Sequence, residues 1–297
     1  MASLNELKTR IASVQDTMKI TNAMYMISNN KMRKARKTWQ DTQPYFDTLE
    51  SVLALALRHM PDDDAEHSLF DQRADIPPSE RKTGYIVITG DKGLAGAYHQ
   101  NIFKMLEASL KETPNNQIFV VGQVGVHFLR QKKIPFDVNF MYTAQDPTLG
   151  RARDMAYQVF HAFHHHMLDD VYVIYTKMIN SVTMKTTKTH LLPLLPEEVK
   201  GTEDPIHTEL ELYPDPKSVV NTVVPDYTVG EIYSTLVEAY CSEQNSRVMA
   251  MENATDSAKD ILSDLKLEYN RARQASITQE ITEIAAGARA QKGNSNN

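Results

Sequence analysis

Residues Glu231 to Ala286 read EIYSTLVEAYCSEQNSRVMAMENATDSAKDILSDLKLEYNRARQASITQEITEIAA and contain neither glycine nor proline. One helix of this length would span roughly 84 Å at 1.5 Å per residue, far more than an ordinary globular helix. Its apolar and small residues recur at alternating spacings of three and four, which is typical of a helix that packs along another helix. These seam positions are Val248, Met251, Thr255, Ala258, Leu262, Leu265, Tyr269, Ala272 and Ser276.

The N-terminal end of the chain supplies a partner for this helix. Its residues before Pro44 also lack glycine and proline, and Ser3 with Glu6 forms a capping-box pattern that predicts a helix start at Leu4. The same spacing recurs at Leu4, Leu7, Ile11, Val14, Met18, Thr21, Tyr25, Ser28, Met32, Ala35 and Trp39. We therefore expect the two ends to form one antiparallel intramolecular coiled coil, with a bend or a break at Pro44.

Two further features of the N-terminal helix suggest contact with another body. Between Met18 and Ile27 the apolar positions widen to a second face, which fits either core burial or a third packing partner. The basic run KMRKARK, from Lys31 to Lys37, fits either a solvated helix face or a contact with an acidic protein.

Composition excludes several classes of protein. The net charge of -6 gives no support to a nucleic-acid partner, because phosphate binding needs a basic surface. Cys241 is the only cysteine, which excludes an intrachain disulfide and fits a small packed thiol in a reducing compartment. No apolar run is long enough to cross a membrane, and neither a signal peptide nor a transit peptide is evident, so we expect no cleaved leader.

The middle of the chain alternates apolar β-branched runs with amphipathic helical segments. Strands are expected at Tyr85–Thr89, from Gln117, weakly at Phe136–Met141 and from Val171, and the stretch from Lys185 fits an antiparallel edge strand. This alternation predicts a Rossmann-like α/β domain with a mostly parallel sheet. The expected divisions are an N-terminal coiled-coil helix at 1–59, a linker at 60–81, the α/β domain at 82–195, an acidic linker at 196–226, a C-terminal coiled-coil helix at 227–290 and a disordered tail at 291–297.

Two motifs in this domain could indicate a phosphate-binding or metal-binding site, but neither has all the residues that such a site needs. The loop TGDKGLAGAYHQN, from Thr89 to Asn101, joins a strand to a helix but matches neither G-x-G-x-x-G nor a P-loop, so its glycines are expected to serve a tight turn. His161 and His165 share a helix face without the Glu or third ligand of a metalloprotease, so we expect a solvated helix end and no metal. We identify no catalytic residue and no cofactor site.

The most specific signal is ITQEITEIAAGARA, from Ile277 to Ala290, which resembles the signature of the gamma subunit of F-type ATP synthases. The residues that match are Ile277, Thr278, Glu280, Glu283, Gly287, Ala288 and Ala290. The segment from Lys19, the glycine loop and the segment from Ser242 resemble the same family in the same order. Ala95, Ala97 and His99 depart from the family's common Cys, Gly and Asn in the loop. The absent transit peptide favours a bacterial protein.

The resemblance implies a non-catalytic central rotor shaft that couples proton flow through the membrane sector to ATP synthesis or hydrolysis on the beta subunits. Its implied partners are three alpha and three beta subunits, the epsilon subunit and the c-subunit ring, at the cytoplasmic face of the cell membrane, with the membrane reached only through the c ring. The transported ion, H⁺ or Na⁺, is left open. The implied hexamer contacts are Met24, Arg33, Lys34, Arg247, Met251, Arg273, Gln274, Thr278 and Glu280, and the implied shaft tip is Ala285, Gly287 and Ala288.

Two rival interpretations follow from the residues alone. A nucleotide-dependent α/β enzyme with helical dimerisation arms would require a phosphate loop and a catalytic constellation, and we find neither in the sequence. A purely structural coiled-coil scaffold would leave the βαβ middle unexplained.

Overall fold

The computed structural model describes residues 3–59, 68–180, 183–196, 199 and 212–294, with side chains as far as residue 287. The chain forms two compact units, one made of Met1–Ile27 with Val248–Asn297 and the other of Ser28–Arg247. We call them the two-helix unit and the α/β unit. Two long helices contribute to both, α1 (Leu4–Arg58) and α5 (Pro216–Asn294).

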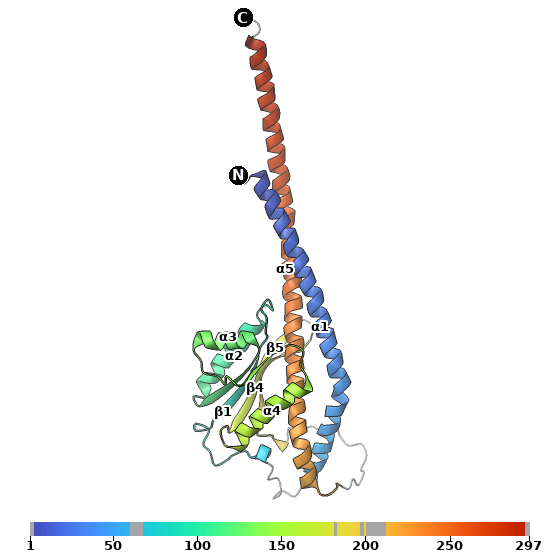
Figure 1. Cartoon of the computed structure of the whole chain (residues 1–297), viewed down its shortest axis with the longest axis vertical. Helices are drawn as coiled ribbons and strands as arrows, with labels where there is room; N and C mark the ends of the chain where they lie inside the picture. The colour runs from blue at the N-terminus through green and yellow to red at the C-terminus, as the bar shows by residue number, and fades with distance from the viewer. Residues whose placement is uncertain (1–2, 60–67, 181–182, 197–198, 200–211, 295–297) are drawn as a thin grey trace. The chain divides into compact units, whose positions relative to one another are not determined.

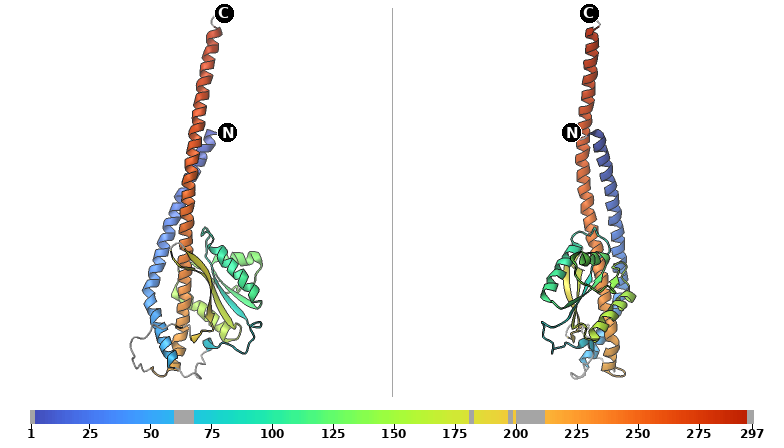
Figure 2. Two further views of the ribbon diagram at one scale, coloured as in Figure 1. Left: turned by 180° about the vertical axis from the view of Figure 1, so that it is seen from behind. Right: turned by 60° about the vertical axis from the view of Figure 1, so that its left-hand side comes forward.

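The two-helix unit is an antiparallel helix pair, as the seam spacing predicts. The two helices run side by side in both views of Figure 2, and Thr21 Oγ1 shares a hydrogen bond of 2.7 Å with Thr255 Oγ1 across the seam. Every predicted seam residue of both helices is buried or half-buried, with Leu7 and Leu265 among the most buried. The 3,4 spacing therefore identified the contact face correctly.

Helix α1 begins where its cap predicts and passes through Pro44 without a break. Ser3 Oγ accepts a hydrogen bond of 3.2 Å from the Glu6 amide. Of the two expected effects of Pro44, a bend or a break, the break is wrong, since the helical span is continuous to Arg58. Both Gln40 and Pro44 are exposed, so water can bind the carbonyl that the proline leaves unpaired.

Helix α5 begins earlier than the sequence division at residue 227 placed it. Asp215 caps it, with Oδ1 accepting from the Ser218 amide at 2.8 Å, and Pro216 occupies the first helical position. The helix then includes Pro225, which the sequence analysis treated as part of a linker. At the other end it reaches Asn294, past the expected start of a disordered tail. Residues 60–67, 200–211 and 295–297, which belong to the expected linkers and tail, lie outside the described residues.

The α/β unit is organised around a five-stranded sheet. Its strands are β1 (Thr83–Ile88), β2 (Asn116–Val121), β3 (Met141–Tyr142), β4 (Asp170–Met178) and β5 (Met184–Leu192). The order is β3-β2-β1-β4-β5, parallel except for the antiparallel edge strand β5. This confirms the mostly parallel sheet, but the weak strand expected at Phe136–Met141 is reduced to two residues. A single turn, η2 (Ser68–Phe70), precedes the sheet.

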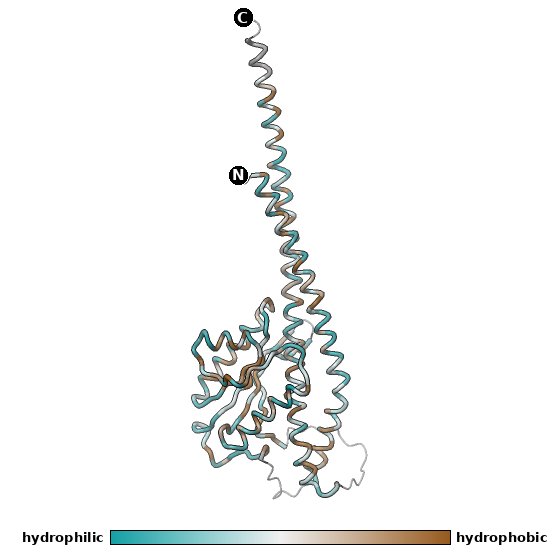
Figure 3. Tube along the Cα trace, in the orientation of Figure 1, coloured by the Kyte–Doolittle hydropathy of each residue, from teal (hydrophilic) through white to brown (hydrophobic). Residues whose placement is uncertain are grey.

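Helices cover both faces of the sheet. Helices α2 (Tyr98–Glu112) and α3 (Gln123–Lys132) lie on one face, and α4 (Leu149–His164) lies on the other (Figure 1). Successive residues of β1 alternate between the two cores, since Tyr85 packs with α2 and α3 whereas Ile86 packs with α4. Strands buried on both faces read as continuous apolar runs, which Figure 3 shows as the brown centre of the domain.

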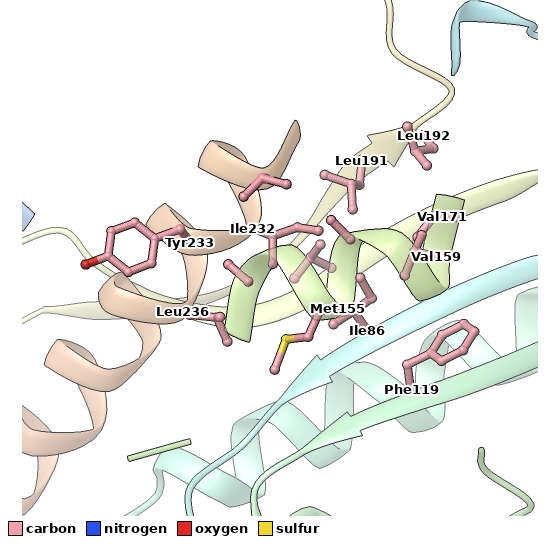
Figure 4. Close-up of a cluster of buried hydrophobic side chains, with 14 of the residues drawn as sticks. Ile86, Phe119, Met155, Val159, Val171, Leu191, Leu192, Ile232, Tyr233 and Leu236 are labelled. Atoms are coloured by element: carbon pink, nitrogen blue, oxygen red, sulfur yellow. The ribbon is translucent and has the colours of Figure 1, made fainter. Parts of the chain in front are cut away.

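The larger core joins α4 and the sheet to the first half of α5. In Figure 4, Met155 of α4 lies near Leu236 of α5, and Val159, farther along α4, lies beside Val171 of β4. The aromatic rings of Trp39, Phe46 and Tyr233 pack together with centroids about 6 Å apart, so the second half of α1 is tied to the same core. None of the helices in the described ranges carries a stretch that is long and apolar enough to cross a membrane.

We predict that Leu265→Ala destabilises the two-helix unit by at least about 2 kcal/mol, because it opens a cavity in the seam. Leu267→Ala is the matched control, since Leu267 is 56% exposed on the same helix. The measurement is thermal unfolding of the free chain followed by circular dichroism. Equal melting temperatures for the two variants would contradict the seam.

Candidate functional site

The two-helix unit presents apolar side chains that its own chain leaves uncovered. On α1, Ile20, Met26 and Ile27 are 61%, 56% and 56% exposed. The second apolar face between Met18 and Ile27 is therefore a surface in this structure and does not belong to the core. Contiguous exposed apolar side chains on a protein mark a surface that another body covers.

A second uncovered surface lies at the C-terminal end of α5. With Thr21 opposite Thr255, the start of α1 at Leu4 falls opposite about Ala272, so later residues of α5 have no partner helix among the described residues of this unit. Figure 2 shows α5 continuing past the N-terminus. Ile277, Ile281 and Ile284 follow one another at helical spacing there and are 47%, 62% and 72% exposed. This segment is an apolar helix face open to a partner.

Most of the predicted contact residues lie on open surface. Met24 is half-buried in the two-helix unit. The part of α5 after Ala272, which we call the single-helix segment, carries four exposed predicted contacts, Arg273, Gln274, Thr278 and Glu280. In the α/β unit, Arg33 and Lys34 are exposed on α1. At the predicted tip, Ala285 and Gly287 are exposed, and a Cβ placed on Gly287 would meet nothing within 4 Å. The side chain of Ala288 lies outside the described residues.

Two of the predicted contacts are buried within their own units. Met251 is a seam residue with only 5% exposure. Arg247 is 6% exposed, and its guanidinium donates to Lys92 O at 3.0 Å, to Gly93 O at 3.1 Å and to Glu243 Oε1 at 2.5 Å. The structure therefore gives Arg247 a role inside the α/β unit, in contact with the glycine loop.

The glycine loop is closed over the carboxyl end of the sheet by Asp91. Its carboxylate accepts from the Gln123 amide at 2.9 Å, at the start of α3, and from the Ala144 amide at 3.0 Å. In an α/β fold, the amides at this helix N-terminus are the ones that would bind a phosphate. Here Asp91 accepts from the first of them, while the Val124 amide donates to Gly90 O and the Gly125 amide to Thr89 Oγ1. Within the glycine loop, Gly96 has a φ of 55°, which fits the expected tight turn, and at the start of α3 Gly122 has a φ of 94° with no room for a Cβ, which would lie 2.7 Å from Gly90 O.

The loop is also joined to α5 through a buried polar cluster. Tyr98 donates its hydroxyl to Ala239 O at 3.0 Å, and His99 Nε2 lies 3.1 Å from Lys92 O. Because a carbonyl only accepts, this ring nitrogen carries a proton, and burial lowers the pKa of His99 below its usual value. Burial raises the pKa of Glu243 above its usual value, against the opposing effect of Arg247.

Sequence reasoning did not identify this cluster. The i,i+4 spacing of Glu243 and Arg247 was a visible signal of an ion pair on one helix face. The loop carbonyls that complete it carry no such signal, because any residue provides a carbonyl.

The remaining motifs are the histidines at the end of α4 and the cysteine of α5. His161, His164, His165 and His166 are exposed at the end of α4, with the rings of His161 and His165 4.3 Å apart, which fits the expected solvated helix end. Among the described residues, no group of three or more His, Cys, Asp or Glu is placed to hold a metal ion. Cys241 is buried, and burial raises the pKa of its thiol to about 11, as expected of a packed thiol that does not ionise at neutral pH.

These features define a class of protein: a helical rod with uncovered apolar faces, joined to an α/β domain in which the amides at the start of α3 are bonded within the protein. Comparison with known proteins identifies the family. The sequence matches the family model for ATP synthase over residues 3–291. It is 40% identical to the ATP synthase gamma chain of Acetivibrio thermocellus, covering 98% of this chain and 100% of that protein. It is 39% identical to the gamma chain of Ruminiclostridium cellulolyticum, covering 97% and 98%.

The fold agrees with this relationship. A chain in the mitochondrial ATP synthase of Euglena gracilis, solved with its F1 part and c ring in rotational state 3, superposes with a TM-score of 0.65 at 16% identity, covering 97% of this chain and 94% of that one. This chain belongs to the ATP synthase gamma chain family.

Proposed function

We propose that this chain is the central rotor shaft of a bacterial F-type ATP synthase. It would turn inside a hexamer of three alpha and three beta subunits and rest, with the epsilon subunit, on the membrane-embedded c ring. Rotation would couple proton flow through the membrane sector to ATP synthesis or hydrolysis on the beta subunits. The single observation that carries this proposal is the rod with uncovered apolar faces in a chain of this family.

The exposed surfaces suit an off-axis shaft. Apolar Ile20, Met26 and Ile27 lie exposed on α1, and the basic Arg33 and Lys34 are exposed farther along the same helix. A rod with an uneven surface makes different contacts with otherwise identical neighbours as it turns, and so stabilises different conformations in them. The α5 segment with Ile277, Ile281 and Ile284 would occupy an apolar collar, where unpaired charges would lose water.

The proposal assigns no bond chemistry to this chain. Asp91 occupies the helix N-terminal amide at the sheet edge, and its other contacts close the loop over that edge. ATP turnover would therefore reside on the beta subunits, and this chain would act at the cytoplasmic face of the cell membrane, without entering the bilayer. The rival enzyme hypothesis requires that loop to open for a nucleotide.

Co-expression tests the proposed function. The chain is produced with alpha and beta subunits of a related bacterial enzyme, and we expect a complex with alpha, beta and gamma in the ratio three to three to one. The free chain is assayed for ATP hydrolysis in parallel. Failure to form the complex, together with turnover by the free chain that Lys92→Ala abolishes, would favour the nucleotide-dependent enzyme.

We predict that the double variant Arg33→Glu and Lys34→Glu lowers the number of protons pumped per ATP hydrolysed. These side chains are exposed, and each ion pair with an acidic beta loop is worth only about 0 to 1 kcal/mol, so both must be reversed. The measurement is proton uptake into membrane vesicles at a matched hydrolysis rate.

The matched control reverses two exposed lysines on α2, Lys104→Glu and Lys111→Glu, with the same change in net charge. A ratio that is unchanged in the first variant, or equally lowered in both, would count against a specific contact at Arg33 and Lys34.

A further inference from the structure

The glycine loop and helix α5 meet in a contact that the proposed shaft function does not explain. Arg247 sits at the last position that α5 contributes to the α/β unit, before the helix continues in the two-helix unit. Its Nε and Nη2 both donate to Gly93 O, at 3.3 and 3.1 Å, and Nη2 also reaches Lys92 O at 3.0 Å. We call Arg247, Glu243 and the carbonyls of Lys92 and Gly93 the loop clasp.

The hydrogen bonds of the loop clasp oppose a rotation of α5 about its own axis. A guanidinium is a planar fork, and two donors directed at carbonyls of one loop leave the side chain little freedom. Glu243, one turn earlier on the same face of α5, accepts a hydrogen bond from Arg247 Nη2 at 2.5 Å. Side-chain exposures of 7% for Arg247 and 4% for Glu243 exclude water from this contact. A rotation of α5 would have to break these bonds without replacement by water.

The loop side of the clasp is itself rigidly held. Asp91, next to Lys92, is bonded to the amides of Gln123 at the start of α3 and of Ala144 and Gln145 after β3. The Gly90 carbonyl accepts from the Val124 amide at 3.0 Å. Force applied to the sheet therefore reaches the loop through several short bonds.

The glycine loop packs directly against α5 at Gly90. A Cβ added to Gly90 would lie 2.7 Å from both Cδ and Oε1 of Glu243 and 2.8 Å from Cε1 of His99. No positive φ is involved at Gly90, so its lack of a side chain serves the approach to Glu243. One turn before Glu243 on α5, the Tyr98 hydroxyl is bonded to Ala239 O.

We propose that the loop clasp is a torsional lock, which holds the angular position of α5 in the α/β domain so that torque on the domain passes into the shaft. The inference rests on the proposed rotor function. Arg247 and Glu243 are positioning residues in it, since they act through the helix and do not contact a reacting group. In their absence α5 keeps fewer directional contacts with the rest of the unit, among them the Tyr98 hydroxyl to Ala239 O and the Ser246 hydroxyl to Met184 Sδ, and the apolar packing that remains resists rotation less well.

The test measures torsional stiffness in the assembled complex. The alpha–beta hexamer is fixed to a surface and halted without nucleotide, and a bead is attached to the α/β domain through Arg153→Cys. Arg153 is exposed and the native Cys241 is buried, so the label attaches selectively. The angular variance of the bead is inversely proportional to the stiffness of the path between domain and hexamer.

We expect Arg247→Gln to raise the angular variance at least about twofold, and Arg247→Lys, which keeps the charge without the fork, to give an intermediate value. Arg130→Gln, at an exposed position on α3, is the matched control and should leave the variance unchanged. A merely structural role would lower the melting temperature of the free chain and leave the variance at the wild-type value, and that result would overturn the proposal.

A second variant covers the case in which Arg247→Gln does not fold. Gly90→Ala removes no polar group and pushes the Glu243 carboxylate away from Arg247, so it too should raise the variance. An unchanged variance in Gly90→Ala would also overturn the lock. Failure of the wild-type chain to assemble three to three to one would instead contradict the proposed function, which keeps the two failures distinct.

Discussion

Replacing Arg73 by Ala is expected to destabilise the α/β unit by about 3 to 5 kcal/mol, the cost of removing one partner from a buried ion pair. Arg73 Nη1 lies 2.5 Å from Asp169 Oδ1, and the two side chains are only 4% and 5% exposed. The guanidinium also donates to the carbonyls of Phe163 and Leu168 and stacks 4.3 Å from the centre of the Phe163 ring. Its loss would leave the Asp169 carboxylate buried without its cation.

The measurement for Arg73→Ala is thermal unfolding of the free chain, where this loss corresponds to a fall of roughly 6 to 20 °C in melting temperature for a unit of this size. Arg153→Ala, at an exposed position, is the matched control and should change the melting temperature little. The double variant Arg73→Ala and Asp169→Asn should be less destabilised than the sum of its single variants, because it removes the stranded charge. Additive effects, or a small loss in Arg73→Ala, would contradict the buried pair as a main support.

Replacing Ala285 by Trp is expected to weaken assembly of the complex roughly five- to hundredfold while leaving the free chain intact. Ala285 is exposed on the single-helix segment, so a larger side chain meets nothing within the chain itself. In a close-fitting collar the added volume would overpack the interface, at about 1 to 3 kcal/mol. The measurements are the melting temperature of the free chain and the yield and ATPase rate of the assembled complex.

Ala108→Trp is the matched control for the tip, because Ala108 is an exposed alanine on helix α2. It should assemble and turn over normally. If Ala285→Trp lowers the melting temperature of the free chain but assembles and hydrolyses ATP at the wild-type rate, the collar is excluded and the tip packs within its own chain.

The spacing of apolar residues along the sequence was enough to predict the paired helices and the main strands. The 3,4 spacing of Leu7, Thr21, Met251 and Leu265 predicted the seam, because a helix with one apolar face must bury it against a partner of matching spacing. The apolar runs of β1, β2 and β4 predicted a parallel sheet covered on both faces. Boundaries set by proline were less certain, since Pro44 and Pro225 lie inside helices whose other contacts outweigh one lost hydrogen bond.

The motif at Ile277–Ala290 identified the family, but the sequence did not show which of its candidate contacts are free. Arg273, Gln274 and Thr278 are exposed because α1 starts too late to cover that part of α5, which follows from the pairing of Thr21 with Thr255. Arg247 matched the family pattern equally well, yet it is buried against a loop more than 150 residues earlier in the chain.

The sequence by itself determined the long helices, the α/β middle and the family, because these depend on periodicity and on a local motif. Only the tertiary structure decided that Asp91 closes the sheet edge, that Arg73 and Asp169 form a buried pair, and that Arg247 holds the glycine loop. Each of these contacts joins a charged side chain to groups distant in sequence, and many of those groups are backbone amides or carbonyls. Every residue except proline offers both groups, so which one is bound is set by the packing of the whole chain.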